Sequence, residues 1–166
     1  MPTPPHVVIV TSNEYDEKVA VATLELLARM EIEGVVVKVP KRPGKTSPAA
    51  RAVEAANRTK ALIGVYLRRG ESTSPFASGT EIRFTPGAQG LAQKALSQIV
   101  GRLHTQSRGH WPEGGSLLLA RVPSIVVIPG FSTHASDAAR LERFPGDYAA
   151  GLAAAIYSYF LEQGAL

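Results

Sequence analysis

The sequence has 166 residues, of which 18 are Lys or Arg, 14 are Asp or Glu, 4 are His and none is Cys. This is the length of one ordinary domain, and 45% hydrophobic with 19% charged residues suffices for a buried core, which excludes a disordered chain. The lack of cysteine excludes disulfides, thiolate metal sites and a Cys nucleophile. A transition metal bound by this protein would therefore depend on histidines and carboxylates.

Short β-branched runs alternate with helical patterns along the chain. Asn13 is a suitable cap for the first helix, and Gly34 is a suitable stop after it. In chain order, the pattern predicts strand 7–10, helix 14–33, strand 35–37, helix 48–57, strand 61–67, exposed and edge-like strand 80–85, helix 88–104, strands 116–120 and 124–128, and helix 146–162. The glycines around Trp111 are interpreted as a turn.

This alternation predicts an α/β fold, a single domain over residues 1–166 with a mostly parallel twisted sheet and helices on both faces. In such sheets the functional crevice lies beyond the carboxyl ends of the strands. The segments that follow strands at that end are 11–17, 68–81 and 129–137, so we expect the functional side chains there.

No segment reaches the roughly 20 apolar residues that a membrane span needs, so no membrane span is expected. The start of the chain lacks the charged and apolar regions of a secretory signal. We therefore expect a cytoplasmic protein, or one of the cell envelope if the chain is trimmed from a longer protein.

The positive charge is concentrated in the basic segment 38–69, which carries nine Lys or Arg residues against the single acid Glu54. Most of these bases are interpreted as solvated side chains of loops and helix faces. An alternative is a module that binds an anionic polymer by charge. Only Tyr66 interleaves with the bases, so a stacking platform for nucleic acid is not expected.

The common catalytic and nucleotide signatures are missing. The sequence has no G-x-x-x-x-G-K-[ST], no G-x-G-x-x-G after the first strand and no G-x-S-x-G elbow. Ser132 and His134 share one loop, but such close neighbours in sequence rarely form a nucleophile–base pair.

Several short motifs occur in the order found in one enzyme family. They are Glu17-Lys18 in the first helix, Ala56-Asn57 before a strand, SGTEIRF at Ser78–Phe84, the helix 88–104, and PSIVVIPGF at Pro123–Phe131 followed by Ser132. With these motifs the chain resembles the zinc-dependent N-acetylmuramoyl-L-alanine amidase catalytic domains, which cut peptidoglycan between the sugar and its stem peptide. The resemblance implies an amidase-like α/β fold and a bacterial cell-wall role.

The sequence departs from the family pattern at the positions of the zinc ligands and the catalytic base. The resemblance puts Asn13 at the first zinc-ligand position, Tyr15 or Glu17 at the second and Leu67 at the third. It puts Ile128 at the position of the catalytic general-base Glu. Leu and Ile have no lone pair for a metal and no proton to exchange. We therefore expect no catalytic residue, no metal ligand set and no cofactor.

The leading hypothesis is a pseudoenzyme, a domain that binds a peptidoglycan fragment or a protein partner or has a regulatory role. Its expected crevice residues are Asn13, Glu17, Arg68, Arg69, Glu71, Glu81, Ser132 and His134. One alternative is an active zinc hydrolase whose ligands have moved to Glu17, His134 and Glu71 or Glu81. A homo-oligomer is a further expectation, because the small residues of the C-terminal helix suit packing against a second copy.

Overall fold

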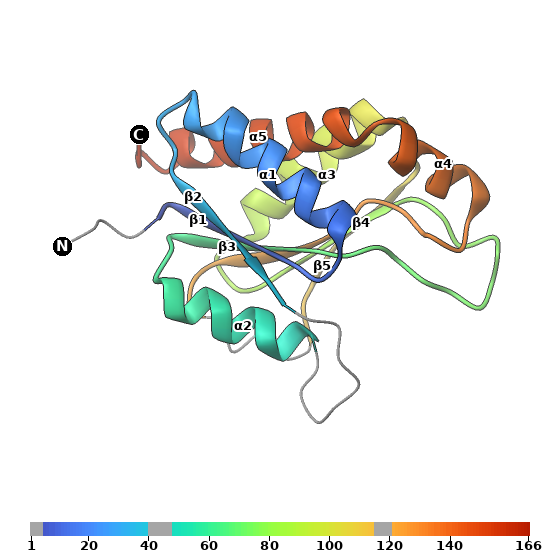
Figure 1. The fold of residues 1–166 in the computed structure, drawn as a ribbon, viewed down its shortest axis with the longest axis horizontal. Helices are drawn as coiled ribbons and strands as arrows, with labels where there is room; N and C mark the ends of the chain where they lie inside the picture. Colours follow the sequence, from blue (N-terminus) through green and yellow to red (C-terminus); the bar gives the residue numbers. More distant parts are fainter. Residues whose placement is uncertain (1–4, 40–47, 115–120) are drawn as a thin grey trace.

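The computed structural model describes residues 5–39, 48–114 and 121–166, and over them the chain forms three layers (Figure 1). A central sheet separates α1, α3 and α5 on one face from α2 on the other (Figure 1). The elements are β1 (Val7–Thr11), α1 (Glu14–Ala28), β2 (Gly34–Lys38), α2 (Pro48–Thr59), β3 (Ile63–Leu67), β4 (Thr80–Phe84), α3 (Gln89–Leu103), β5 (Ser107–Pro112), β6 (Ser124–Ile128), α4 (Ala135–Arg143) and α5 (Pro145–Glu162).

The sheet has six strands in the order β2-β1-β3-β6-β4-β5. Strands β2, β1, β3 and β6 are parallel to one another, whereas β4 pairs antiparallel with β6 and parallel with β5. The carboxyl ends of β1, β3 and β6 therefore meet the start of β4 at one end of the sheet. The single α/β domain with a mostly parallel sheet is the predicted fold class, and it is confirmed.

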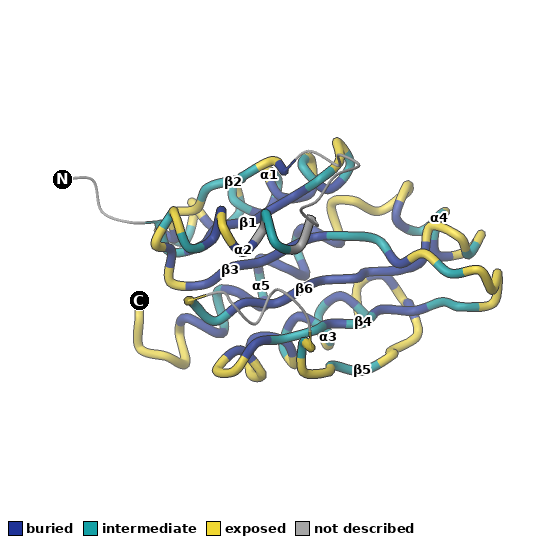
Figure 2. The backbone as a smooth tube through the Cα atoms, turned by 90° about the horizontal axis from the view of Figure 1, so that it is seen from below, coloured by how far each residue is buried: buried dark blue, intermediate teal, exposed yellow. Residues whose placement is uncertain are grey.

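The two faces of the sheet are covered differently. Every residue of β1, β3 and β6 is buried, and these strands run dark through the middle of the molecule (Figure 2). One face packs on α1, α3 and α5 through a large apolar cluster that includes Ile9, Leu67 and Ile99. The other face packs on α2 through a smaller cluster that includes Val10 and Tyr66. Buried strands of this kind read as continuous β-branched runs, which is why the sequence predicts them.

The small residues of α5 are explained by packing within the chain. A Cβ atom on Gly151 would lie 3.1 Å from Arg102 Cδ and 3.3 Å from the Gln98 carbonyl oxygen, both on α3. The face expected to meet a second copy is thus in contact with α3.

The first helix is shorter than predicted. The sequence predicts a helix to Glu33, but α1 ends at Ala28. The next residues form a turn in which Glu31 has a φ of 61°, and the Ile32 N–H donates to the Leu27 carbonyl at 3.0 Å. This turn buries the Ile32 side chain completely against the core. Burial of Ile32 at the turn therefore ends the helix before Gly34.

Three elements after β3 differ from the prediction. The prediction of a turn at the glycines around Trp111 is wrong, because residues 107–112 form the edge strand β5. Helix α4 (Ala135–Arg143) is not predicted from the sequence, and His134, the last residue of the loop after β6, is its N-cap. Strand β4 is not an edge strand, because β5 covers its outer side. The strand predicted at 116–120 lies outside the described residues.

Within the described ranges, no helix has the length and apolarity needed to cross a bilayer.

Candidate functional site

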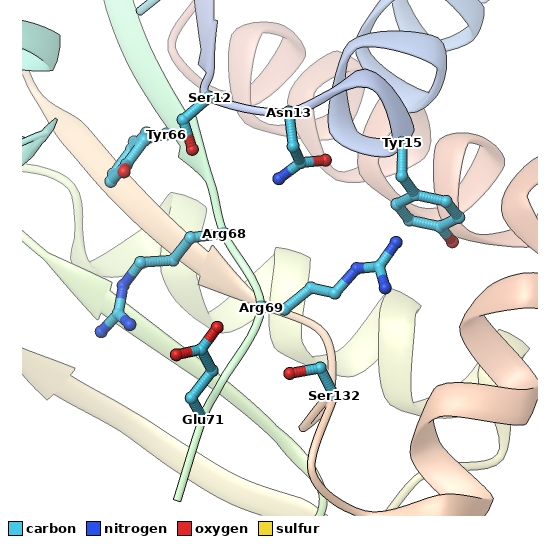
Figure 3. A pocket seen from close by; sticks show the side chains of 8 residues that line it. All are labelled: Ser12, Asn13, Tyr15, Tyr66, Arg68, Arg69, Glu71 and Ser132. Atoms are coloured by element: carbon cyan, nitrogen blue, oxygen red, sulfur yellow. The ribbon is translucent and has the colours of Figure 1, made fainter. Parts of the chain in front are cut away.

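A pocket of about 540 Å³ lies at the carboxyl ends of β1 and β3 (Figure 3). We call it the strand-end pocket. It is lined by Ser12, Asn13, Tyr15, Tyr66, Arg68, Arg69, Glu71 and Ser132. The three segments that the sequence indicates, 11–17, 68–81 and 129–137, all contribute to it. Its side chains are mostly polar, and they include two guanidinium groups and one carboxylate.

Five of the eight predicted crevice residues line this pocket. They are Asn13, Arg68, Arg69, Glu71 and Ser132. Sequence reasoning did not single out Ser12 and Tyr66 as site residues. Tyr66 lies two positions before Arg68, and alternate residues of a strand point to the same side. This alternation could have predicted that Tyr66 lines the pocket together with Arg68.

The other three predicted residues lie elsewhere. The Glu17 carboxylate pairs with Lys38 Nζ at 3.0 Å, outside the strand-end pocket. The Glu81 carboxylate is 3.3 Å from Arg83 Nε on the neighbouring part of β4. His134 caps α4, and its Nδ1 accepts from the Asp137 N–H at 3.2 Å.

Arg69 is held at the mouth of the pocket by an aromatic ring. Its Cζ lies 4.0 Å from the centroid of the Tyr15 ring, which is a cation–π contact. The Tyr15 hydroxyl donates to the Leu141 carbonyl of α4 and so ties α1 to α4. Burial raises the pKa of Tyr15 to about 12, although the Arg69 charge acts in the opposite direction. Tyr15 is thus neutral at physiological pH, and it orients Arg69.

Asn13 closes the first turn of α1. Its Oδ1 accepts from the Asp16 N–H at 2.8 Å, and its Nδ2 donates to Asp16 Oδ2 at 2.6 Å. These two bonds cap the helix start. They also use both polar atoms of a side chain that the family resemblance puts at a zinc-ligand position.

A buried polar cluster lies under the pocket. Asp16 is fully buried, and burial raises the pKa of its carboxyl, which the hydrogen bond from Asn13 and the charge of Arg69 partly offset. Asp16 Oδ1, Arg69 Nε and the Tyr148 hydroxyl are buried, and no described residue gives them a hydrogen-bond partner. Burial, with the Asp16 charge in second place, also raises the pKa of Tyr148 well above its usual value. These polar groups thus adjoin the apolar cluster between the sheet and the helices α1, α3 and α5, to which Tyr148 belongs.

The turn after β6 forms the lower wall of the pocket. Phe131 pairs with Gly70 in an isolated parallel bridge, and the Ser132 hydroxyl donates to the Gly70 carbonyl at 3.3 Å. A Cβ atom on Gly70 would lie only 2.8 Å from the Phe131 ring, so glycine is required for this approach. Asp137 Oδ2 accepts from the backbone N–H groups of Gly79, at 2.8 Å, and Phe131, at 3.0 Å. The buried Asp137 carboxylate therefore joins three separate segments.

The positions that the resemblance assigns to a metal ligand and a base are buried. Leu67 is fully buried in the cluster on the side of α1, α3 and α5. Ile128 is buried in the cluster on the side of α2. Neither lines the strand-end pocket.

The side chains that line the strand-end pocket do not fit a zinc ion as ligands. Zinc sites use Cys, His and carboxylate ligands, and this pocket offers the single carboxylate of Glu71 beside two guanidinium groups. Across the described residues, no group of three or more His, Asp or Glu side chains is placed to hold a metal ion. The positive charge of the pocket instead suits an anionic group.

Solved structures resemble this chain closely in fold. An N-acetylmuramoyl-L-alanine amidase from Clostridium difficile 630 superposes with a TM-score of 0.78 at 19% identity, over 98% of this chain and 100% of that one. The catalytic domain of such an amidase from Bacillus (Paenibacillus) polymyxa var. colistinus gives 0.77 at 18% identity, over 93% and 97% of the two chains. The chain has the amidase fold.

A third structure with the amidase fold is a complex. The CwlD amidase from Clostridioides difficile, solved with the GerS lipoprotein, gives a TM-score of 0.76 at 13% identity, over 95% of this chain and 99% of that one. No protein-family model matches the sequence, and no curated protein matches it either. The likeness therefore lies in the arrangement of the elements, whereas the sequences share only 13% to 19% identity with this chain.

Proposed function

We propose that this domain is a non-catalytic member of the amidase fold whose strand-end pocket binds an anionic group of a peptidoglycan fragment. The observation that carries the proposal is the lining of the pocket, which has two arginines, one carboxylate and no imidazole. The amidase fold of the solved cell-wall amidases supports peptidoglycan as the class of ligand.

The pocket has the chemistry to hold a peptide carboxylate. Arg68 and Arg69 are each partly exposed, and a guanidinium group binds a carboxylate through two parallel hydrogen bonds. The contact with Tyr15 orients Arg69 before a ligand arrives, which lowers the entropy lost on binding. Glu71 in the same pocket adds a negative charge that suits an ammonium group. Stem peptides carry both kinds of charge.

The same lining supports the absence of hydrolysis. Amide hydrolysis by a zinc enzyme needs three protein ligands, a bound water and a base that guides the water. Asn13 already uses both of its amide atoms on Asp16, and Leu67 and Ile128 are buried side chains without a basic atom. The relocated set of Glu17, His134 and Glu71 or Glu81 is spread over separate sites, with Glu17 and Glu81 engaged by Lys38 and Arg83. We therefore propose that no zinc cofactor is bound.

A protein partner and the cell envelope remain part of the proposal. The CwlD amidase of the same fold is solved in complex with a lipoprotein. A pseudoenzyme of this fold that binds wall fragments would act where such fragments occur, and it would report on them to a partner.

The binding proposal is tested by calorimetric titration of soluble stem-peptide fragments into the protein. Arg68→Ala should weaken binding about tenfold or more, since it removes a charge-assisted pair. Arg58→Ala is the matched control, because Arg58 is an exposed arginine of α2 in the basic segment 38–69 but outside the pocket. Equal losses in both variants, with a steep dependence on salt, would contradict the pocket and favour the anionic-polymer alternative.

The non-catalytic proposal is tested by adding zinc. We expect no stoichiometric zinc binding by calorimetry, and no release of stem peptide from purified sacculi with zinc or with chelator. Tight one-to-one zinc binding, or release of peptide that a chelator stops, would show a hydrolase instead.

A further inference from the structure

A second pocket, separate from the strand-end pocket, lies at the β5 edge of the sheet. We call it the edge pocket. Its volume is about 400 Å³, and it is lined by Ser78, Glu81, Gln106, Ser107, Arg108 and Trp111. Trp111 is the only tryptophan of the chain, and 52% of its surface is exposed. Trp111 thus places an exposed aromatic side chain among the polar groups of this pocket.

The Trp111 side chain is held in position. Its Nε1 donates to the Arg108 carbonyl at 3.0 Å. Gly109 has a φ of 89°, and a Cβ atom there would lie 3.2 Å from Trp111 Cζ2, so the indole packs directly on the glycine. The pairing of β4 with β5 shifts by one residue at this place, which is a β-bulge. Bulges re-aim side chains, and this one puts a fixed aromatic ring on the surface.

The rim of the edge pocket is polar and nearly neutral. Glu81 is paired with Arg83, and one Arg108 nitrogen donates to the Ser78 carbonyl at 3.4 Å. Gln106 and Ser107 add an exposed amide and a hydroxyl. One carboxylate and one guanidinium in the lining give no net charge, which disfavours a nucleic acid. Trp111 is the only large apolar side chain in the lining, which disfavours an apolar protein surface.

A rigid ring beside neutral hydrogen-bonding groups fits a sugar. The C–H face of a pyranose ring is apolar and stacks on an aromatic ring, while its hydroxyl groups need donors and acceptors at the side. We infer that the edge pocket binds a neutral carbohydrate chain, with Trp111 as the stacking platform and Glu81, Gln106 and Arg108 as hydrogen-bonding partners.

The edge pocket faces the same side of the sheet as the strand-end pocket. The register aligns Tyr66, Val126, Arg83 and Trp111 in one row across four neighbouring strands. Three strand spacings separate the ends of this row by roughly 14 Å. Phe131 also lies between the pockets, with Gly70 against its ring and Arg108 Cζ 4.9 Å from its centroid. A glycan on Trp111 thus lies within reach of a group attached to it in the strand-end pocket.

The test uses the fluorescence of the single tryptophan. A peptide-free hexamer of N-acetylglucosamine, titrated into the whole protein, should shift and quench the Trp111 emission to saturation, and the effect should not depend on salt, because the probe is neutral. An emission spectrum that stays unchanged at high concentrations of the hexamer would overturn the inference.

Variants assign the binding to this ring. By calorimetry, Trp111→Ala should weaken hexamer binding about tenfold or more, and Trp111→Tyr should retain part of it. Phe76→Ala is the control, since Phe76 is an exposed aromatic residue outside the edge pocket. Arg68→Ala should leave hexamer binding unchanged. If Arg68→Ala abolishes it, the glycan binds in the strand-end pocket and the inference is wrong. If the unaltered protein binds the hexamer but no stem peptide, only the proposed function is contradicted.

Discussion

Two helix starts border the strand-end pocket, and both carry a buried aspartate at the third helical position. In α1 the cap is Asn13 and the aspartate is Asp16, which is 0% exposed. In α4 the cap is His134 and the aspartate is Asp137, which is 2% exposed. In both turns the cap side chain accepts a hydrogen bond from the backbone N–H of the aspartate. The two local motifs are therefore nearly the same.

Their surroundings differ. Asp137 Oδ2 accepts from two backbone N–H groups of other segments, and Arg140 and His134 lie within 4.0 Å of its Oδ1. Asp16 Oδ2 accepts from Asn13, and within the part of the chain that the structure describes its Oδ1 has no partner. The same local motif thus gives a hydrogen-bonded carboxylate in α4 and, in α1, a buried carboxyl with one unpaired oxygen beneath the pocket.

The comparison has a physical lesson. A carboxylate that receives backbone hydrogen bonds stabilises the fold, whereas one that is desolvated without them destabilises it. Buried polar groups without hydrogen-bond partners occur preferentially at functional sites, where they serve binding rather than stability. We therefore expect the two aspartates to respond to substitution in different ways.

The largest effect should come from Asp137. Asp137→Ala should lower the free energy of unfolding by about 3 kcal/mol, because two buried N–H groups lose their acceptor. Urea unfolding followed by circular dichroism measures it. Asp147→Ala is the control, since Asp147 is exposed in the first turn of α5. If Asp16→Ala costs as much as Asp137→Ala, the contrast between the two turns is wrong.

A smaller effect is expected at the cap of α1. Asn13→Ala should cost about 1 kcal/mol, because the Asp16 N–H loses its acceptor and the Asp16 carboxylate loses its donor. Asn13→Ser should recover part of the loss, since a serine hydroxyl caps helices well. Thermal unfolding of the three proteins checks the order, and equal stability of Asn13→Ala and the parent protein would contradict it.

The smallest effect is a pH dependence at Asp16. Burial raises the pKa of this carboxyl in the folded state above its ordinary value of 3.8, so the folded protein favours the protonated form. The stability from Asp16 is therefore complete below pH 3.8 and is lost as the pH rises through the folded pKa. Asp16→Asn should thus gain stability relative to the parent between pH 3.5 and 7. A stability difference that is constant over this range would argue against an unsatisfied carboxylate.

Much of the fold is predictable because buried strands have a recognisable local sequence pattern. The strands Val7–Thr11, Ile63–Leu67 and Ser124–Ile128 are buried on both faces, so their sequences are continuous apolar runs. The rule that parallel strands place function at their carboxyl ends then selects the three segments that line the strand-end pocket.

Other features have no local signal. Strand β5 is an exposed edge strand with a glycine bulge, so its sequence Ser107–Pro112 has the composition of a turn. Its β structure comes from pairing with β4, which lies more than 20 residues earlier in the chain. In the same way, α4 is short and polar, and the core contact of Leu141 and the long-range bonds of Asp137 support it.

The candidate site likewise has features that the sequence predicts and features that only the tertiary structure decides. The sequence already indicates positive charge at the end of β3 through Arg68 and Arg69, and the family resemblance puts Asn13 at a zinc-ligand position. Only the tertiary structure decides that Arg68, Arg69 and Glu71 share one pocket while Glu17 and Glu81 pair with Lys38 and Arg83. The sequence by itself determined the buried strands and the helices that cover both faces of the sheet, because the spacing of apolar residues is a local property of the chain. Its pockets were decided by contacts between distant segments, because a side chain binds whatever the fold brings within a few ångströms of it.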